Sequence, residues 1–126
     1  MRCGETLLFS ILGSNQIPHL WVIVTEPNPD DWLCVIVSVT TLRNNCDQTV
    51  TLRRGDHPFV THDSAISYTD AMIVDVRSLD AEVAAGRASS NSACSADLLE
   101  LVQNGLLASP FTPKKVAFFC RHKWGK

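Results

Sequence analysis

Three histidines, His19, His57 and His62, stand where an expected strand meets a loop. Asp56 and Asp63 each adjoin one of these histidines in the sequence. Histidine changes its charge near neutral pH and is the commonest general acid or base in enzymes. The alternative is that these residues only shape turns, since histidines are common in exposed loops and few of them are catalytic. The pattern is compatible both with a catalytic site at the ends of the strands and with ordinary loops.

Two hydroxyls and a permanent cation, Thr40, Thr41 and Arg43, follow a long apolar run. Polar groups at the end of a strand are held rigidly and still reach solvent, so sites are often built there. Arginine holds phosphate through paired hydrogen bonds, and the Arg53-Arg54 pair adds two further cations. The alternative is a solvated strand edge, where charge discourages aggregation. We predict a candidate phosphate-binding site at this strand end.

Other kinds of chemistry match the sequence less well. His57 and His62 are five residues apart with no Cys-x-x-Cys pair to support them, which matches no recurrent metal-ligand spacing. The chain has no Gly-x-Ser-x-Gly motif, and its six glycines are scattered rather than gathered in a phosphate-binding loop. We therefore expect neither a metal site nor a cofactor.

The expected site depends on a pair of central strands. Residues 20–24 and 33–39 are rich in β-branched side chains and are joined by a segment with two prolines and two aspartates. This pattern predicts two adjacent buried strands with a polar turn. A turn is expected at residues 13–15. Further strands are expected at residues 5–12, 49–52, 64–68 and 71–76.

The periodicity changes after the last expected strand. Ser78 is expected to cap a short helix that runs through Glu82 and is closed by Gly86. Residues 88–94 are polar and small and predict a loop. Ser95 then precedes a segment whose apolar residues recur at the spacing of an amphipathic helix.

Thr112 is expected to cap the last helix, which begins with Pro113 at its first position and continues to about Arg121. Because strands come first and helices follow, the predicted fold class is mainly β with C-terminal helices (α+β). We expect a small, partly open antiparallel barrel at about residues 5–76, followed by two or three helices at about 78–123. A chain of 126 residues fits a single domain.

The composition indicates which binding partners and which cellular compartment to expect. A formal net charge of −2 means that no global basic field favours nucleic acid, although a local arginine patch would suffice. No apolar run approaches the roughly 20 residues that a membrane-spanning helix needs. The five cysteines are odd in number and scattered, which is typical of a reduced protein. We expect a cytoplasmic protein with no membrane association.

The order of four segments carries a family resemblance. Residues 18–25 match a first long strand, 34–41 a second, and 49–52 and 64–75 the strands that follow. In this order they resemble the MazF/PemK-like toxin family of small SH3-like barrel endoribonucleases, over about residues 17–85. The family has an arginine–proline pair where this chain has Pro18-His19.

The resemblance implies an endoribonuclease that cleaves single-stranded RNA without metal, has an antitoxin protein as partner and is a homodimer. The family threonine falls on Thr40 or Thr41. In this hypothesis the RNA 2′-hydroxyl attacks the adjacent phosphate, His57 or His19 is the base or acid, and Arg43 stabilises the charge. The expected RNA-binding residues are Arg53, Arg54 and His62.

A second hypothesis is a non-catalytic barrel module that binds a peptide or nucleic acid in a toxin–antitoxin-like or regulatory system. Its histidines would be structural. The negative net charge and the missing arginine favour this module. The clustered histidines and the Arg53-Arg54 pair favour the ribonuclease, which we take as the main hypothesis.

Overall fold

The computed structural model describes residues 1–10 and 17–126. Within these residues the chain forms six strands and three helices. The strands are β1 Thr6–Phe9, β2 His19–Ile23, β3 Leu33–Thr41, β4 Thr51–Leu52, β5 Ser64–Asp75 and β6 Ser89–Asn91, and the helices are α1 Val76–Ala84, α2 Ala96–Ala108 and α3 Lys114–Lys123.

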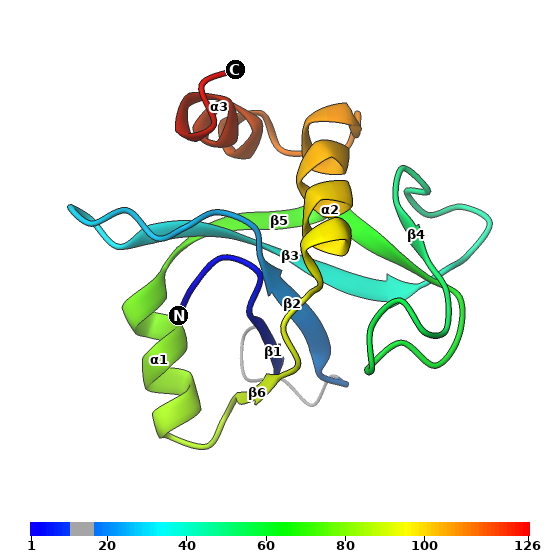
Figure 1. The fold of residues 1–126 in the computed structure, drawn as a ribbon, viewed down its shortest axis with the longest axis horizontal. Coiled ribbons are helices and arrows are strands. Elements are labelled where there is room, and N and C mark those ends of the chain that lie inside the picture. The colour runs from blue at the N-terminus through cyan, green and yellow to red at the C-terminus, as the bar shows by residue number, and fades with distance from the viewer. Residues whose placement is uncertain (11–16) are drawn as a thin grey trace.

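The strands form one antiparallel sheet in the order β4-β5-β3-β2-β1-β6. Figure 1 shows the sheet curled and open, with α2 and α3 over one face and α1 against the other. The expected α+β class, a partly open antiparallel barrel with helices in the C-terminal part, is confirmed. Residues 11 and 12 of the first expected strand and the turn expected at 13–15 lie outside the described residues.

The expected central hairpin is confirmed, because β2 and β3 pair directly and place Val22 opposite Val37. The apolar runs are continuous because both faces of these strands are covered. Leu20 and Val22 pack beneath α2 and α3, whereas Trp21 and Ile23 face the cluster that includes α1. Alternate side chains of one strand therefore belong to two different cores, as the pleat of a strand requires.

The two strands expected at 64–68 and 71–76 are a single strand, β5, so this prediction was wrong. The break expected at Thr69-Asp70 is instead an irregularity in the pairing with β3. Ile36 pairs with Met72 and Ser38 with Ser67, so Val37 alone lies opposite the four residues 68–71 of β5. Such a bulge bends the strand and increases its twist, which is consistent with the curled sheet.

The first helix starts earlier than expected. Asp75, not Ser78, is its N-cap, because β5 ends there and the Asp75 carboxylate accepts a hydrogen bond from the backbone N–H of Arg77. The same carboxylate forms an ion pair with the Arg77 guanidinium at 2.7 Å. Gly86 follows the helix in the left-handed region with φ of 77°, as expected for a glycine after a C-terminal cap.

The expected amphipathic helix is confirmed as α2, with the Ser95 hydroxyl accepting from the backbone N–H of Leu98. The preceding residues differ from expectation, because the loop predicted at 88–94 contains β6. This strand pairs with β1 and places Ser90 opposite Leu7. Its three residues are polar and exposed, so they carry no hydrophobic pattern that would have revealed an edge strand.

The last helix, α3, begins at Lys114 with Pro113 as its N-cap. Thr112 was expected to cap it, but the Thr112 hydroxyl donates to the backbone carbonyl of Leu106 at the end of α2. Pro113 makes no side-chain cap. The threonine therefore fastens the turn between the two helices rather than the start of the second one.

The second helix lies very close to the sheet at Gly105. The hydroxyl of the fully buried Tyr68 donates to the backbone carbonyl of Val102 at 2.7 Å. A Cβ atom at Gly105 would overlap that hydroxyl and the Val50 side chain. Glycine is therefore required at this position by the close approach of α2 to β5. None of the helices formed by the described residues is long and apolar enough to cross a membrane.

Candidate functional site

An open pocket of about 560 Å³ lies where the start of β2, the end of β3 and the loop before β5 meet. The antiparallel register explains this meeting, since Leu20 pairs with Val39 and Thr41 with Ser64. The lining residues come from three separate segments of the chain: Ile17, Pro18, His19, Val39, Thr40, Thr41, Arg43, Phe59, Val60, Thr61, His62 and Ser64.

His19 is an exposed residue at the start of β2. Its ring Nδ1 lies 3.3 Å from the backbone carbonyl of Val39. A carbonyl oxygen only accepts, so Nδ1 carries the hydrogen in this contact. In the neutral ring Nε2 then has a free lone pair, and the contacts among the described residues give it no protein partner. This nitrogen can therefore accept a proton from a bound molecule.

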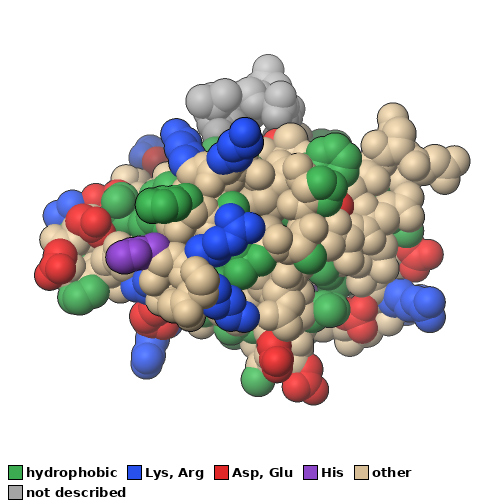
Figure 2. Space-filling view, turned by 90° about the horizontal axis from the view of Figure 1, so that it is seen from above, with side chains coloured by type: hydrophobic (Ala, Val, Ile, Leu, Met, Phe, Trp, Pro, Cys, Tyr) green, Lys and Arg blue, Asp and Glu red, His purple; other side chains and the backbone are tan. Residues whose placement is uncertain are grey.

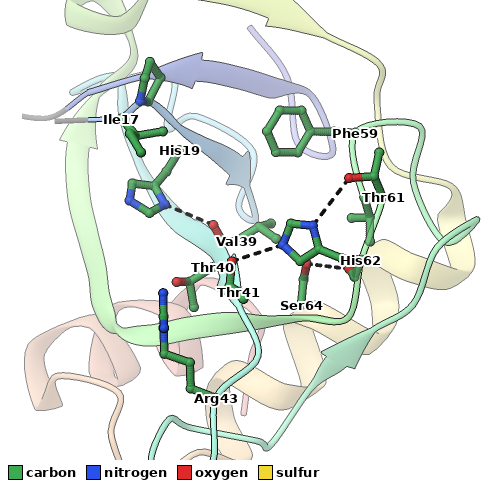
Figure 3. A pocket seen from close by; sticks show the side chains of 12 residues that line it. Ile17, His19, Val39, Thr40, Thr41, Arg43, Phe59, Thr61, His62 and Ser64 are labelled. Carbon is green, nitrogen blue, oxygen red and sulfur yellow. Dashed lines mark hydrogen bonds between the residues drawn. The ribbon is translucent and has the colours of Figure 1, made fainter.

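His62 lies on the opposite side of the pocket, across Thr40 and Thr41 (Figure 3). Its Nε2 is 3.0 Å from Thr41 Oγ1 and its Nδ1 is 3.4 Å from Thr61 Oγ1. Hydroxyl groups both donate and accept, so these partners can hold the ring in its neutral or its charged form. The Ser64 hydroxyl also donates to the His62 carbonyl at 2.9 Å, which orders the backbone.

Arg43 brings the pocket's positive charge. Its guanidinium forms no ion pair with any described residue, and Figure 3 shows it reaching toward Thr40. The backbone at Arg43 is held by Cys46, whose Sγ accepts from the Arg43 N–H and donates to the Arg43 carbonyl at 3.1 Å. The turn is therefore ordered while the side chain stays available to an anion.

His57 does not join this pocket. The residue is buried, with 3% of its surface exposed. Its Nδ1 accepts from the Phe59 N–H at 3.0 Å, and its Nε2 contacts the Ser92 carbonyl. Because an amide donates and a carbonyl accepts, the neutral ring must carry its hydrogen on Nε2. Both ring nitrogens have hydrogen-bond partners, so His57 connects two loops. It does not lie in the pocket, where we expected it.

The arginine pair also lies outside the pocket lining. Arg53 and Arg54 are exposed in the turn that follows β4, and the Arg53 N–H donates to the Asp56 carboxylate at 2.7 Å. Their guanidinium groups form no ion pair with the described residues. Of the eight residues predicted for the site, five line one pocket: His19, Thr40, Thr41, Arg43 and His62.

A second hollow of about 410 Å³ adjoins the pocket and shares Ile17, His19 and Thr40 with it. The β5 bulge supplies part of its other wall through Thr69 and Asp70. Sequence reasoning missed this hollow because it placed these two residues in a break between two strands. The Ser67 hydroxyl, which donates to the Asp70 carboxylate at 2.7 Å, closes the bulge locally.

No cysteine is among the residues that line the pocket, and three of the five are poor nucleophiles. All five are free thiols, and desolvation raises the pKa of Cys34 to about 11 and of Cys120 to about 12. Burial likewise raises the pKa of Cys94 to about 11. Thiols of this kind stay protonated and unreactive near neutral pH. Nor do the described residues contain a group of three His, Cys, Asp or Glu side chains arranged to hold a metal ion.

No protein-family model matches this chain, and no curated protein is significantly similar to it. The resemblance to the MazF/PemK-like toxins stays a prediction. The function is therefore argued from the chemistry of the pocket.

Proposed function

We propose that the pocket cleaves single-stranded RNA by a metal-independent transesterification in which His19 and His62 exchange protons with the substrate. The observation that carries this proposal is that two imidazole rings from different segments of the chain line the same open pocket as Arg43, a cation without an ion-pair partner among the described residues. An acid and a base on opposite sides of a phosphate are what an in-line attack requires.

The proposed reaction has one bond formed and one broken at phosphorus. The ribose 2′-oxygen attacks the adjacent phosphorus atom, and its proton passes to Nε2 of His19. The bond from phosphorus to the 5′-oxygen breaks, and that oxygen takes a proton from Nδ1 of the charged His62 ring, whose 3.4 Å contact with Thr61 is the longer of the two contacts of this ring. The products are a 2′,3′-cyclic phosphate and a free 5′-hydroxyl. His19 suits the base because its Nδ1 already donates to Val39.

Arg43 and the two threonines complete the proposed site. The Arg43 guanidinium would stabilise the negative charge that grows on the phosphate oxygens. Thr41 would act as a positioning residue, because its hydroxyl contacts the His62 ring rather than open space. Thr40, which lines both hollows, would orient the phosphate. His57 is replaced in this scheme by His62.

Single-stranded RNA is the favoured substrate because the in-line geometry at the 2′-hydroxyl and the base edges are hidden in a duplex. The cytoplasmic location, the antitoxin partner and the homodimer remain parts of the proposal. The location is supported by the five free cysteines. The partner and the dimer rest on the resemblance of the strand order to the MazF/PemK-like family.

The experiment is cleavage of a single-stranded RNA in EDTA beside the same RNA with 2′-deoxyribose at the mapped cleavage site. We expect discrete fragments with cyclic phosphate ends from the first RNA and no cleavage at the substituted position. Cleavage of the deoxy-substituted bond would contradict attack by the 2′-oxygen. An RNA that is bound but stays intact would favour the non-catalytic binding module instead.

A further inference from the structure

The cations of this protein are concentrated at its C-terminal end. Residues 110–126 hold five of the 11 Lys and Arg residues and none of the 13 Asp and Glu residues. Most of them lie on α3. Figure 2, which looks onto the face covered by α2 and α3, shows Lys and Arg side chains gathered there with hydrophobic side chains between them. An otherwise acidic chain therefore carries one local basic surface.

The inner side of α3 is fixed by the core, which determines what its outer side presents. Val116 and Cys120 are buried against the sheet and α2. The outer side carries Phe118, which is 74% exposed, and Phe111 just before the helix is 56% exposed. Exposed aromatic rings of this extent on a folded surface are typical of binding sites.

A groove of about 610 Å³ runs between the end of α2 and the outer side of α3. Lys114, Lys115 and Arg121 line it together with Phe118. No ion pair or hydrogen bond within the described residues engages the charged ends of these three cations. The groove thus combines unpaired positive charge with an exposed aromatic face. We call these four residues the α3 surface.

We propose that the α3 surface binds single-stranded RNA. Its cations would neutralise successive phosphates, which releases counterions and contributes affinity. Phe118 would stack on a base, as aromatic side chains do in proteins that hold single strands without reading their sequence. Within residues 110–126 the two large exposed apolar side chains, Phe111 and Phe118, are aromatic, which favours bases over the apolar residues of an acidic peptide.

This proposal rests on the proposed function only in taking RNA as the ligand. The α3 surface shares no lining residue with the pocket that holds His19 and His62. It would retain a long strand without taking part in the chemistry. Longer RNAs should therefore benefit from it, whereas very short ones should not.

The test measures binding of a fluorescent single-stranded 2′-O-methyl RNA, which lacks the nucleophile and is not cleaved. The variants are Lys115→Gln/Arg121→Gln and Phe118→Ala. The matched control, Arg77→Gln/Arg87→Gln, removes two exposed cations beside α1, on the other face of the sheet.

We expect the charge variant to weaken binding at least tenfold. The slope of log K against log salt concentration should fall in magnitude by about 1.4, since each single-strand phosphate contact contributes about 0.7. Phe118→Ala should weaken binding about 5- to 150-fold. The control should bind as the wild type does.

Equal binding by the α3 variants and the control would overturn the proposal. So would displacement of the RNA by a poly-glutamate peptide, or stronger binding to anionic phosphatidylserine vesicles than to RNA. Cleavage of a tetranucleotide pool separates the two proposals. If α3 variants cleave it normally but bind long RNA weakly, both proposals stand. If the wild type binds RNA through α3 yet cleaves nothing, only the α3 proposal survives.

Discussion

Thr41 Oγ1 lies 3.0 Å from Nε2 of His62, and this contact connects the end of β3 to the loop before β5. The register produces it, because Thr41 pairs with Ser64, two residues after His62. A shift of one residue would turn the threonine to the other face of the sheet. The position of this imidazole therefore depends on the pairing of β3 with β5.

Replacing Thr41 tests whether that contact serves catalysis. Thr41→Val keeps the shape but removes the hydroxyl, so we expect RNA cleavage to slow about tenfold, or about 1.4 kcal/mol of transition-state free energy. Thr41→Ser should restore the rate. Because Thr41 is exposed, stability should change little. The measurement is kcat/KM together with the urea midpoint. A valine variant with the wild-type kcat/KM would contradict the role of Thr41.

His57 should matter for stability and not for chemistry. His57→Ala removes a buried ring and leaves the Ser92 carbonyl and the Phe59 N–H without this partner. We expect it to lower the free energy of unfolding by about 2 to 4 kcal/mol. The cleavage rate per folded molecule should stay unchanged. Urea denaturation, combined with cleavage rates measured at urea concentrations well below the midpoint, checks both expectations. A large loss of rate in folded protein would show that His57 takes part in the reaction.

Two apolar runs rich in β-branched residues, with a proline-containing segment between them, were enough to predict the sheet centre. Both faces of β2 and β3 are buried, so the runs are continuous. The polar edge strand β6 and the bulge at Thr69-Asp70 lacked such a signal, because each depends on backbone pairing with a distant strand. The same limit applies to the site. The strand register decides which residues line the pocket, and the sequence does not reveal the register. It therefore cannot distinguish His62, which lines the pocket, from the buried His57.

Gly105 allows the close contact between α2 and the sheet. Gly105→Ala adds a methyl group that overlaps the Tyr68 hydroxyl and Val50. Although alanine favours helix, we expect overpacking to dominate and to lower the free energy of unfolding by about 1 to 3 kcal/mol. The matched control is Asn104→Ala, an exposed position in the same helix. Urea denaturation of both variants decides, and an unchanged or raised midpoint for Gly105→Ala would contradict this packing.

Asp47 should make stability depend on pH in the acid range. Partial burial raises the pKa of its carboxyl, but hydrogen bonds from Ser109 and Thr49 outweigh this and lower the pKa below its usual value of 3.8. A depressed folded-state pKa stabilises the fold above the unfolded value, and this contribution is lost as pH falls through the folded-state pKa.

The variant Asp47→Asn tests this effect, because its side chain carries no charge and has one acceptor oxygen, so it cannot accept from both Ser109 and Thr49 as the two carboxylate oxygens do. We expect wild type to be more stable than the variant at pH 7 and the difference to shrink below about pH 4. Urea midpoints at several pH values measure it. A difference that is constant from pH 7 to pH 2.5 would contradict a titrating Asp47 (the range brackets the usual carboxyl values).

The most direct test of the central claim is the rate of single-stranded RNA cleavage in EDTA by wild type, His19→Ala, His62→Ala and His122→Ala. His122 lies on α3 outside the pocket and serves as the histidine control. We predict a loss of at least about 100-fold for each of the two pocket variants, as the removal of a general acid or base produces, and an unchanged rate for His122→Ala. Wild-type cleavage rates for His19→Ala and His62→Ala, or no cleavage by any of the four proteins, would contradict the account.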